Sequence, residues 1–454
     1  MQKRVFFFFG CLAFSALLFT GCGGKKAGVP KPAEETVAPY NIKVSYSPND
    51  PDQVREWKQI IQSYFDTILS GKLNGQILVA KNGEILFEAY VGKPWLHKDS
   101  QQVMNGHTPL HLASVSKTFT GMAVLKLYEN KQLDIDSAVG TYLPGFPYPA
   151  VTVRMLLNHR SGLPNYVHQL TTWGWPEHKM ATNHDLLNLL NTVKPPVYFP
   201  AGTRFAYCNT NYAMLALIIE KVSGKPYPVY MDKYIFKPLG MNDTYVFEPK
   251  DTFRATPSYD WRGQMIPFNY LDGIYGDKNI YSTVRDLYKW DQALYTNQFL
   301  SEASKNQAYS PYSFEKPGIK NYGLGWRMFN FPNNKKIIFH NGWWHGNNTA
   351  FQRLVQDSAT IICLGSRYTR GVYSVLQLSY LFGDYPFEIE QEEGADSANS
   401  ARDSLLLKTI KARTDSVKMA RKKNDPPVQK DSVPVAPVKD TARNPVQQKQ
   451  NRPR

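Results

Sequence analysis

The stretch HLASVSKTFTG, from His111 to Gly121, places a serine and a lysine three residues apart where the chain is expected to enter a helix. A serine oxygen at a helix N-terminus lies in a favourable field, and a lysine one turn later projects from the same face. A lysine buried there loses its preference for the charged form and can accept the serine proton. Ser114 and Lys117 are therefore a candidate nucleophile and activator. The alternative is two ordinary polar residues on a solvated helix face.

The same spacing occurs by chance in a chain of 454 residues, so the pair alone is weak evidence. Ser313 and Lys316 repeat it. The second pair runs directly into Pro317 and Gly318, which argues against a helix at that point. We therefore predict that the first pair belongs to a site and that the second does not.

Outward from this stretch, the pattern predicts a sheet built from both ends of the chain. Apolar residues recur every three or four positions between 51 and 70, which is typical of an amphipathic helix. GQILVAK and EILFEAYVG follow as two strands joined through Asn82 and Gly83, a strong hairpin signal. Further strand patterns come late in the chain, in GLGWRMFN, KKIIFH, NTAFQRLVQD and ATIICLGSR, before an apolar stretch at 373–382 that suits a closing helix.

The middle of the chain, from about 118 to 300, is mainly helical in pattern. The helical segments are TFTGMAVLKLYENKQL, VTVRMLLNHRS, NHDLLNLLNTV, YAMLALIIEKVSG and STVRDLYKWDQALY. Helices enclosed between strands indicate an α+β fold, with a mainly helical domain inserted into a sheet-based one. The cleft between two such lobes is a natural place for a ligand.

The first 22 residues, MQKRVFFFFGCLAFSALLFTGC, are typical of a secretory signal. Two basic residues precede an apolar run that is too short for a comfortable membrane span and ends in small residues. The closing FTGC resembles the lipobox of bacterial lipoproteins, which implies cleavage before Cys22 and acylation of its thiol. We expect a lipoprotein of the bacterial cell envelope, in the periplasm or on the outer surface. A plain signal anchor or a cleaved signal is the alternative.

The formal charge of +15 lies mostly in the C-terminal tail. Residues 401–454 hold 14 Lys and Arg against 5 Asp, which accounts for nine of the surplus positive charges. The tail is almost free of aromatic residues and cannot bury enough surface to fold. We interpret it as a solvated spacer. Contact with anionic cell wall is a second hypothesis, which would fail if deleting the residues after Asp396 left retention on wall material unchanged. Nucleic-acid binding has no support outside this tail.

The four cysteines exclude a disulfide framework. Cys11 leaves with the signal and Cys22 is lipidated, so only Cys208 and Cys363 remain for the folded part. The nine histidines contain no H-E-x-x-H, and we predict neither a metal nor a cofactor. No G-x-S-x-G elbow of an α/β-hydrolase is found.

Two further segments carry candidate site residues. Tyr207 and Asn209 lie in FPAGTRFAYCNTNYAM, on a loop before a long apolar helix, where a structural hydrogen-bonding tyrosine is the competing interpretation. His340 ends the strand KKIIFH, and Gly342 lets backbone approach a ligand closely. A satisfied histidine at a strand end is the alternative there.

Taken in order, the three segments resemble the motifs of the serine β-lactamase and penicillin-binding-protein superfamily. The match is to its class C branch, with D-stereospecific peptidases and esterases. Ser114-x-x-Lys117 matches the first motif, Tyr207-x-Asn209 the second, and His340-x-Gly342 the third. The flanks LDIDSAVGTYLPGFP, VTVRMLLNHRSGLP, KYIFKPLGMNDT, IYSTVRDLYKWDQAL and YGLGWRM agree, so that the likeness covers roughly residues 57–382.

The resemblance implies an antiparallel sheet flanked by N- and C-terminal helices with a helical insertion. Together with the signal pattern and the composition of the two ends, it divides the chain into a signal (1–21), a lipidated cysteine and tether (22–47), a hydrolase domain (48–385) and a tail (386–454). Within the hydrolase domain, the sheet lobe spans about 48–110 and 320–385, and the helical lobe about 111–319.

The resemblance also implies the roles of the residues. Ser114 would be the nucleophile, Lys117 and Tyr207 would share proton transfer, and Asn209 would bind the substrate amide or the lysine. His340, where many relatives carry lysine, would assist proton traffic or orient the substrate. Backbone N–H groups of Ser114 and Trp343 would form an oxyanion hole.

Departures from the family pattern leave the substrate open. Asn341 replaces the usual threonine, and Trp343 and Trp344 replace small residues, which predicts a pocket narrowed or walled by aromatic rings. Histidine at 340 weakens recognition of a substrate carboxylate. We therefore expect a serine hydrolase acting through an acyl-enzyme on D-amino-acid peptides, cell-wall-related amides or small esters. The alternative is a non-catalytic descendant that binds wall fragments or a partner protein.

Overall fold

The structure, a computed structural model, describes residues 37–96 and 101–387. The predicted signal, the lipidation site at Cys22, most of the tether and the basic tail lie outside the described residues.

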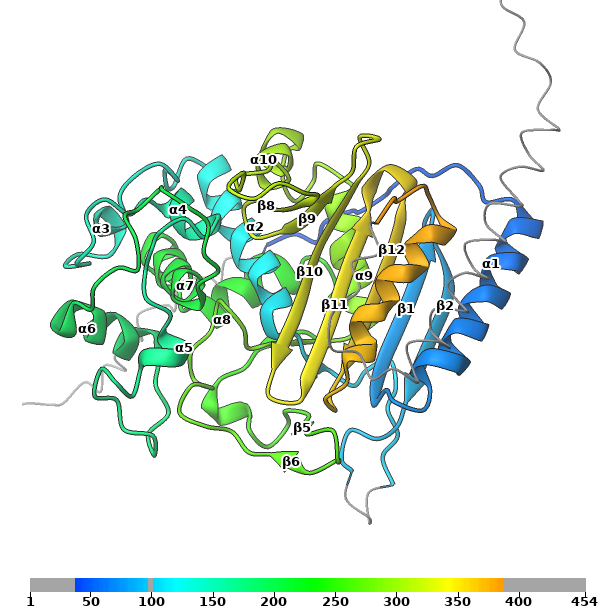
Figure 1. Cartoon of the computed structure of the whole chain (residues 1–454), viewed down its shortest axis with the longest axis horizontal. Helices are drawn as coiled ribbons and strands as arrows, with labels where there is room; N and C mark the ends of the chain where they lie inside the picture. The colour runs from blue at the N-terminus through cyan, green and yellow to red at the C-terminus, as the bar shows by residue number, and fades with distance from the viewer. Residues whose placement is uncertain (1–36, 97–100, 388–454) are drawn as a thin grey trace, which may run out of the picture. The chain divides into compact units, whose positions relative to one another are not determined.

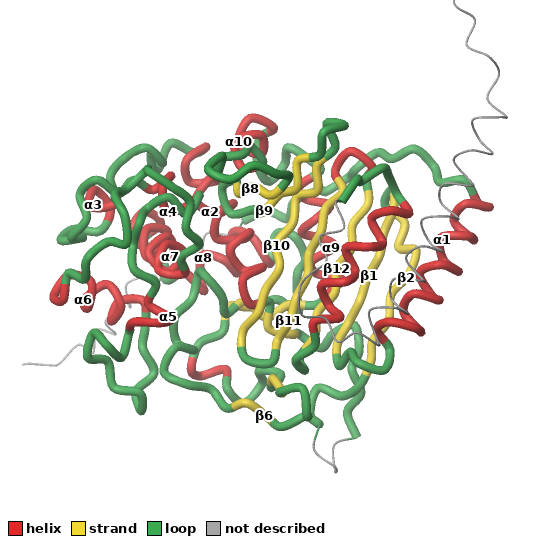
Figure 2. Tube along the Cα trace, in the orientation of Figure 1, coloured by secondary structure: helices red, strands yellow, loops and turns green. Residues whose placement is uncertain are grey.

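A seven-stranded antiparallel sheet forms the central layer (Figures 1 and 2). Its strand order is β2-β1-β12-β11-β10-β9-β8. The strands are β1 Gly75–Lys81, β2 Glu84–Val91, β8 Lys320–Tyr322, β9 Arg327–Asn330, β10 Lys336–Trp344, β11 Asn347–Leu354 and β12 Ala359–Gly365. Gly75 of β1 lies opposite Gly365 of β12, so the early and late parts of the chain meet inside one sheet. The predicted α+β fold with an antiparallel sheet is confirmed.

Side chains of β1 alternate between two apolar cores, because successive residues of a strand point to opposite faces. Ile77 and Val79 pack with the helix α1, Pro51–Tyr64, and with the 3₁₀-helix Arg370–Leu381, drawn in orange in Figure 1. Leu78 and Ala80 face the larger core on the other side of the sheet. The sheet is therefore covered on both faces.

The predicted hairpin turn is confirmed. Lys81 pairs with Glu84, and the two residues between them, Asn82 and Gly83, have φ of 47° and 76°. Positive φ at both central residues is what a type I′ turn requires, and Asn-Gly tolerates it best.

The larger core is enclosed by helices from the middle of the chain. They are α2 Ser116–Glu129, α3 Val139–Tyr142, α4 Val153–Leu157, α5 Tyr166–Gln169, α6 Asn183–Val193, α7 Asn209–Ser223, α8 Tyr227–Met231, α9 Val284–Leu294 and α10 Glu302–Ala308. Short strands add a three-stranded sheet, β3 Leu110–His111, β7 Ile280–Ser282 and β4 Tyr245–Val246, and a hairpin of β5 Ser258–Tyr259 and β6 Met265–Ile266. No helix in 37–96 or 101–387 is long and apolar enough to cross a membrane.

Helix α2 carries Lys117 and is buried on nearly all sides. It packs against α7, which begins at Asn209. The helix was expected to start near Ser114; instead a 3₁₀ turn, Ala113–Val115, precedes an α-helix that begins at Ser116. The turn contains Ala113 at φ 47°, a conformation that costs a non-glycine residue roughly 1–2 kcal/mol. This strained turn presents Ser114 at the head of the buried helix.

Candidate active site

A cavity of about 990 Å³ contains the predicted nucleophile in its wall. Its other walls come from α5, from the start of α7, and from β9 and β10. Residues from all three predicted motifs line it, including Ser114, Tyr207, Asn209, Asn341, Gly342 and Trp343. The fold thus brings together segments that lie more than two hundred residues apart along the chain.

Lys117 lies next to Ser114 and is completely buried. Its Nζ is 3.1 Å from Oγ of Ser114, 2.8 Å from Oδ1 of Asn209 and 2.7 Å from the backbone carbonyl oxygen of Asp277. Two of these partners are carbonyl oxygens, which only accept hydrogen bonds, whereas the hydroxyl can also donate. Nζ donates to all three partners, and its contact with Oγ places it within reach of the serine proton. The geometry suits a general base.

Tyr207 lies beside Lys117 and lines the cavity. The centre of its ring is 5.0 Å from Nζ of Lys117, and the guanidinium carbon of Arg327 lies 4.8 Å from the same ring. The guanidinium of Arg327 holds the ring in place by cation–π attraction, and Nζ of Lys117 also lies over the ring. The phenol is therefore positioned beside the base and at the surface of the cavity.

Gly342 allows the nucleophile turn to lie directly against strand β10. A β-carbon at Gly342 would stand 2.6 Å from the carbonyl oxygen of Leu112 and 2.9 Å from Cβ of Ala113, closer than real contacts allow. Because the residue has no side chain, the turn that carries Ser114 lies directly against β10, and both Ser114 and Trp343 line the cavity. Their backbone N–H groups remain the predicted oxyanion donors.

His340 lies behind the cavity wall and not in it. Its Nδ1 is 2.7 Å from the carbonyl oxygen of Asn341, so Nδ1 carries the hydrogen and Nε2 is an acceptor. The hydroxyl of Tyr322 donates to that Nε2 at 3.2 Å and accepts from Nε2–H of His159 at 3.2 Å. Nδ1 of His159 in turn accepts the backbone N–H of Cys208. A series of hydrogen bonds with defined donors and acceptors thus links the second motif to the third.

Burial, with the positive charges of Arg327 and Lys117, holds the pKa of His340 well below its usual range. The neutral imidazole has both nitrogens engaged away from the cavity. Its direct part in proton transfer therefore stays a prediction, and its hydrogen bond with Tyr322 ties β10 to β8. Two cationic side chains line the cavity, Arg327 on β9 and Lys320 on β8.

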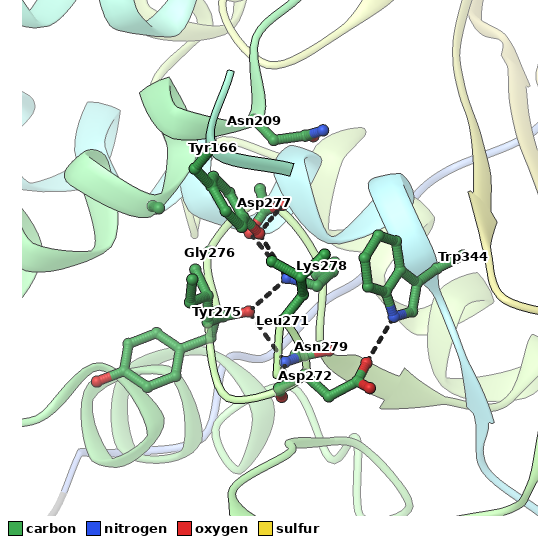
Figure 3. A network of polar contacts seen from close by, with 12 residues as sticks. Tyr166, Asn209, Leu271, Asp272, Tyr275, Gly276, Asp277, Lys278, Asn279 and Trp344 are labelled. Atoms are coloured by element: carbon green, nitrogen blue, oxygen red, sulfur yellow. Dashed lines mark hydrogen bonds and ion pairs between the residues drawn. The ribbon is translucent and has the colours of Figure 1, made fainter. Parts of the chain in front are cut away.

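The tryptophans of the third motif form walls of the cavity, as the sequence led us to expect. Trp343 is 66% exposed, and Trp344 donates from Nε1 to a carboxylate oxygen of Asp272 at 2.6 Å (Figure 3). Cys208 is buried, which raises the pKa of its thiol to about 11. The thiol is therefore protonated at neutral pH and acts as a small buried side chain.

Three charged residues of this region were not among the predicted site residues. Arg327 lies in the stretch YGLGWRM, and Asp277 and Lys278 are adjacent in GIYGDKN. Adjacent opposite charges inside an otherwise uncharged stretch were a usable signal, although nothing in the sequence tells which site they join. Ser313 lies outside any helix, as Pro317 and Gly318 led us to expect. In 37–96 and 101–387, no group of three His, Cys, Asp or Glu residues could hold a metal ion.

Comparison with known proteins gives one family. A profile described as Beta-lactamase matches residues 62–362. Penicillin-binding protein 4* of Bacillus subtilis (strain 168) is 34% identical over 367 residues, covering 76% of this chain and 80% of that protein. A D-aminopeptidase of Brucella canis is 27% identical over 273 residues, covering 59% of this chain and 51% of that protein.

Solved structures share the fold. A penicillin binding protein from Bacillus halodurans superimposes with a TM-score of 0.61 at 24% identity, covering 71% of this chain and 98% of that one. At this identity the likeness concerns the fold alone.

Proposed function

This chain belongs to the beta-lactamase family, and from that premise we propose that it is a serine hydrolase that forms an acyl-enzyme on Ser114. The family includes hydrolases of the serine type, among them a D-aminopeptidase related to this chain. The observation that carries the proposal is the contact between Nζ of Lys117 and Oγ of Ser114 at the cavity wall.

The proposed reaction starts with attack of Oγ of Ser114 on the acyl carbon, while its proton passes to Lys117. The carbonyl oxygen takes up the negative charge that develops and is stabilised by the N–H groups of Ser114 and Trp343. When the bond to the leaving amine or alcohol breaks, the proton is returned to the leaving group through Tyr207. Water then attacks the acyl-enzyme, loses its proton along the same route, and releases the acid and Ser114.

The substrates we propose are D-amino-acid peptides, cell-wall-related amides or small esters. The D-aminopeptidase and the penicillin-binding protein among the relatives support an amide with a D-centre. Arg327 supports a substrate with an anionic group, and the rings of Trp343 and Trp344 support an apolar one beside it. This cation offsets the weaker carboxylate recognition expected from histidine at 340.

Steady-state kinetics on a matched panel tests the substrate class. The panel is a D-amino-acid amide, its L-enantiomer, a p-nitrophenyl ester and a penicillin, each measured with Ser114→Ala beside the wild type. The proposal predicts Ser114-dependent turnover of the D-amide or the ester, and slow or absent turnover of penicillin. Equal rates on the D- and L-amides would remove the D-specific proposal.

We also propose that the enzyme works in the cell envelope, tethered by lipid on Cys22, on the strength of the signal and lipobox pattern. Fractionation of cells expressing the wild type or Cys22→Ala tests this. Membrane retention that is the same in both would refute the anchor.

A further inference from the structure

A second cavity, of about 270 Å³, lies beside the catalytic cavity and shares a wall with it. Trp344 and His345 line both cavities. Ser114, Tyr207 and Gly342 line the catalytic cavity only. The second cavity is therefore a distinct space and not part of the place where the acyl group would react.

The polar side of this second cavity is held by the loop from Asp272 to Asn279. The carboxylate of Asp272 accepts from Nε1 of Trp344 at 2.6 Å and lies 3.0 Å from Nε2 of His345 (Figure 3). At the other end of the loop, Oδ1 of Asn279 lies 3.0 Å from Nε2 of His111, which also lines the cavity. These hydrogen bonds fix the shared wall in place.

The opposite part of the lining is mainly apolar and comes from the hairpin of β5 and β6 and its flanks. Its apolar side chains include Pro257, Met265, Ile266, Pro267 and Phe268. Met265 and Phe268 are 47% and 37% exposed, so solvent reaches the lining at these residues. A ligand bound against them would remove apolar surface from water, which is the usual source of affinity in a small-molecule site.

Two buried polar groups of the lining have no hydrogen-bond partner among the described residues. One is the hydroxyl of Tyr281, a residue that is 2% exposed. The other is Oδ1 of Asn347, whose orientation is fixed because Nδ2 of the same amide donates to the carbonyl oxygen of Trp344. Buried polar groups are normally hydrogen-bonded, so two open ones at a single cavity point to a polar partner that binds there.

The volume of the cavity limits the size of that partner. A dry cavity of about 150 Å³ holds benzene. A cavity of about 270 Å³ accordingly suits a bicyclic aromatic molecule. The ionisable pair of the lining, Asp272 and His345, is already joined by a hydrogen bond, so the cavity offers no unpaired charge to an ionic ligand.

We propose that the second cavity is a binding site for an uncharged bicyclic aromatic ligand that carries one hydrogen-bond donor. The rings lie against Met265 and Phe268, and the donor bonds the hydroxyl oxygen of Tyr281. The inference goes beyond the proposed function and does not rest on it, because no atom of the proposed reaction belongs to this cavity. Ligand and acyl group can therefore be bound together.

The test uses indole as the probe and indene, which has the same ring shape without the N–H, as the control ligand. Each is titrated into the full-length protein, and the dissociation constant is measured by ligand-observed NMR. Tyr281→Phe removes only the hydroxyl. We expect this variant to bind indole about threefold to tenfold more weakly than the wild type, the usual value of one hydrogen bond, and to bind indene equally well.

Tyr245→Phe is the matched control variant. The ring of Tyr245 is stacked on that of Tyr281, and its buried hydroxyl also has no partner among the described residues, but it does not line the cavity. Its loss should leave indole binding unchanged. Ala255 is buried and lines the cavity, so Ala255→Leu should fill the space and abolish binding of both probes. If that variant does not fold, the two tyrosine variants decide the matter.

The absence of saturable indole binding, or equal weakening in Tyr281→Phe and Tyr245→Phe, would overturn the inference. Loss of indole binding once Ser114 carries a fluorophosphonate would also overturn it, because the probe would then occupy the catalytic cavity. A folded wild type that binds indole as expected but is never labelled at Ser114 would overturn the proposed function and leave this inference standing.

Discussion

Gly342 is the residue on which the contact between the nucleophile turn and strand β10 depends. Any side chain there would meet Oγ1 of Thr349 at 2.3 Å and the carbonyl oxygen of Leu112 at 2.6 Å. The backbone atom and the interior of the sheet cannot move aside easily, because packed cores resist added volume.

Gly342→Ala is therefore expected to lower the free energy of unfolding by roughly 1–3 kcal/mol, the usual cost of overpacking. It should also slow fluorophosphonate labelling of Ser114, because the turn is pushed off the strand. Denaturant unfolding and labelling rates measure the two effects. Gly140→Ala is the control, since nothing lies within 4 Å of a β-carbon at that position. Equal stability of the two variants would contradict the predicted close approach.

Among single residues, the sequence predicts well those whose contact depends on their spacing along the chain. Ser114 and Lys117 are one helical turn apart, and the structure places their side-chain atoms 3.1 Å apart. The burial of His340 and the position of Arg327 depend on which face of a strand each side chain occupies. That face is set by register, and a shift of one residue would exchange it.

At the scale of elements, Tyr322 on β8 joins β10 to the loop that follows α4. Its hydroxyl lies 3.2 Å from Nε2 of both His340 and His159, giving to one and accepting from the other. The three side chains are buried.

Tyr322→Phe should cost roughly 1–3 kcal/mol of unfolding free energy, because it leaves buried histidine nitrogens without partners. Thermal or denaturant unfolding measures this. Tyr295→Phe is the matched control: its buried hydroxyl has no hydrogen-bond partner among the described residues, so its removal should cost little. If both variants lose the same free energy of unfolding, the proposed hydrogen bonds from Tyr322 to the two histidines are contradicted.

Helices and strands with a clear hydrophobic periodicity or turn signal were predicted well, and irregular elements were not. The hairpin at Asn82 and Gly83 follows from turn chemistry, and α7 from its long apolar run. The strained 3₁₀ turn before α2 and the 3₁₀ form of the closing helix are set by tertiary contacts, which local periodicity does not carry.

At the scale of the whole molecule, three buried histidines make stability depend on pH. Burial lowers the pKa of His111 to about 4 and those of His159 and His340 well below their usual range. The unfolded chain binds protons at these residues below about pH 6.5, while the folded chain does not.

Stability should therefore be fully present above about pH 6.5 and fall as pH decreases, by roughly 1 kcal/mol per pH unit for each histidine. Denaturant unfolding between about pH 7 and about pH 5 checks this, a window above most carboxylate titrations. A constant free energy of unfolding across that window would show that these histidines gain protons in the folded state.

The arrangement of the whole chain was predictable in outline, because strands at both ends around a helical middle indicate one sheet with an insertion. The support of the site by the loop from Asp272 to Asn279 was not. The hydrogen bonds of Asp277 to Lys117 and Tyr166 join residues more than a hundred positions apart in the sequence.

The most direct test of Ser114 as the nucleophile is intact-mass spectrometry after reaction with a fluorophosphonate, on the wild type, Ser114→Ala and Ser313→Ala. Ser313 carries the same three-residue spacing to a lysine and is the matched control. We predict one adduct on the wild type and on Ser313→Ala, and none on Ser114→Ala. An adduct that survives in Ser114→Ala, or a folded wild type that takes none, would contradict a catalytic Ser114, and the second result would favour a binding protein that has kept the fold.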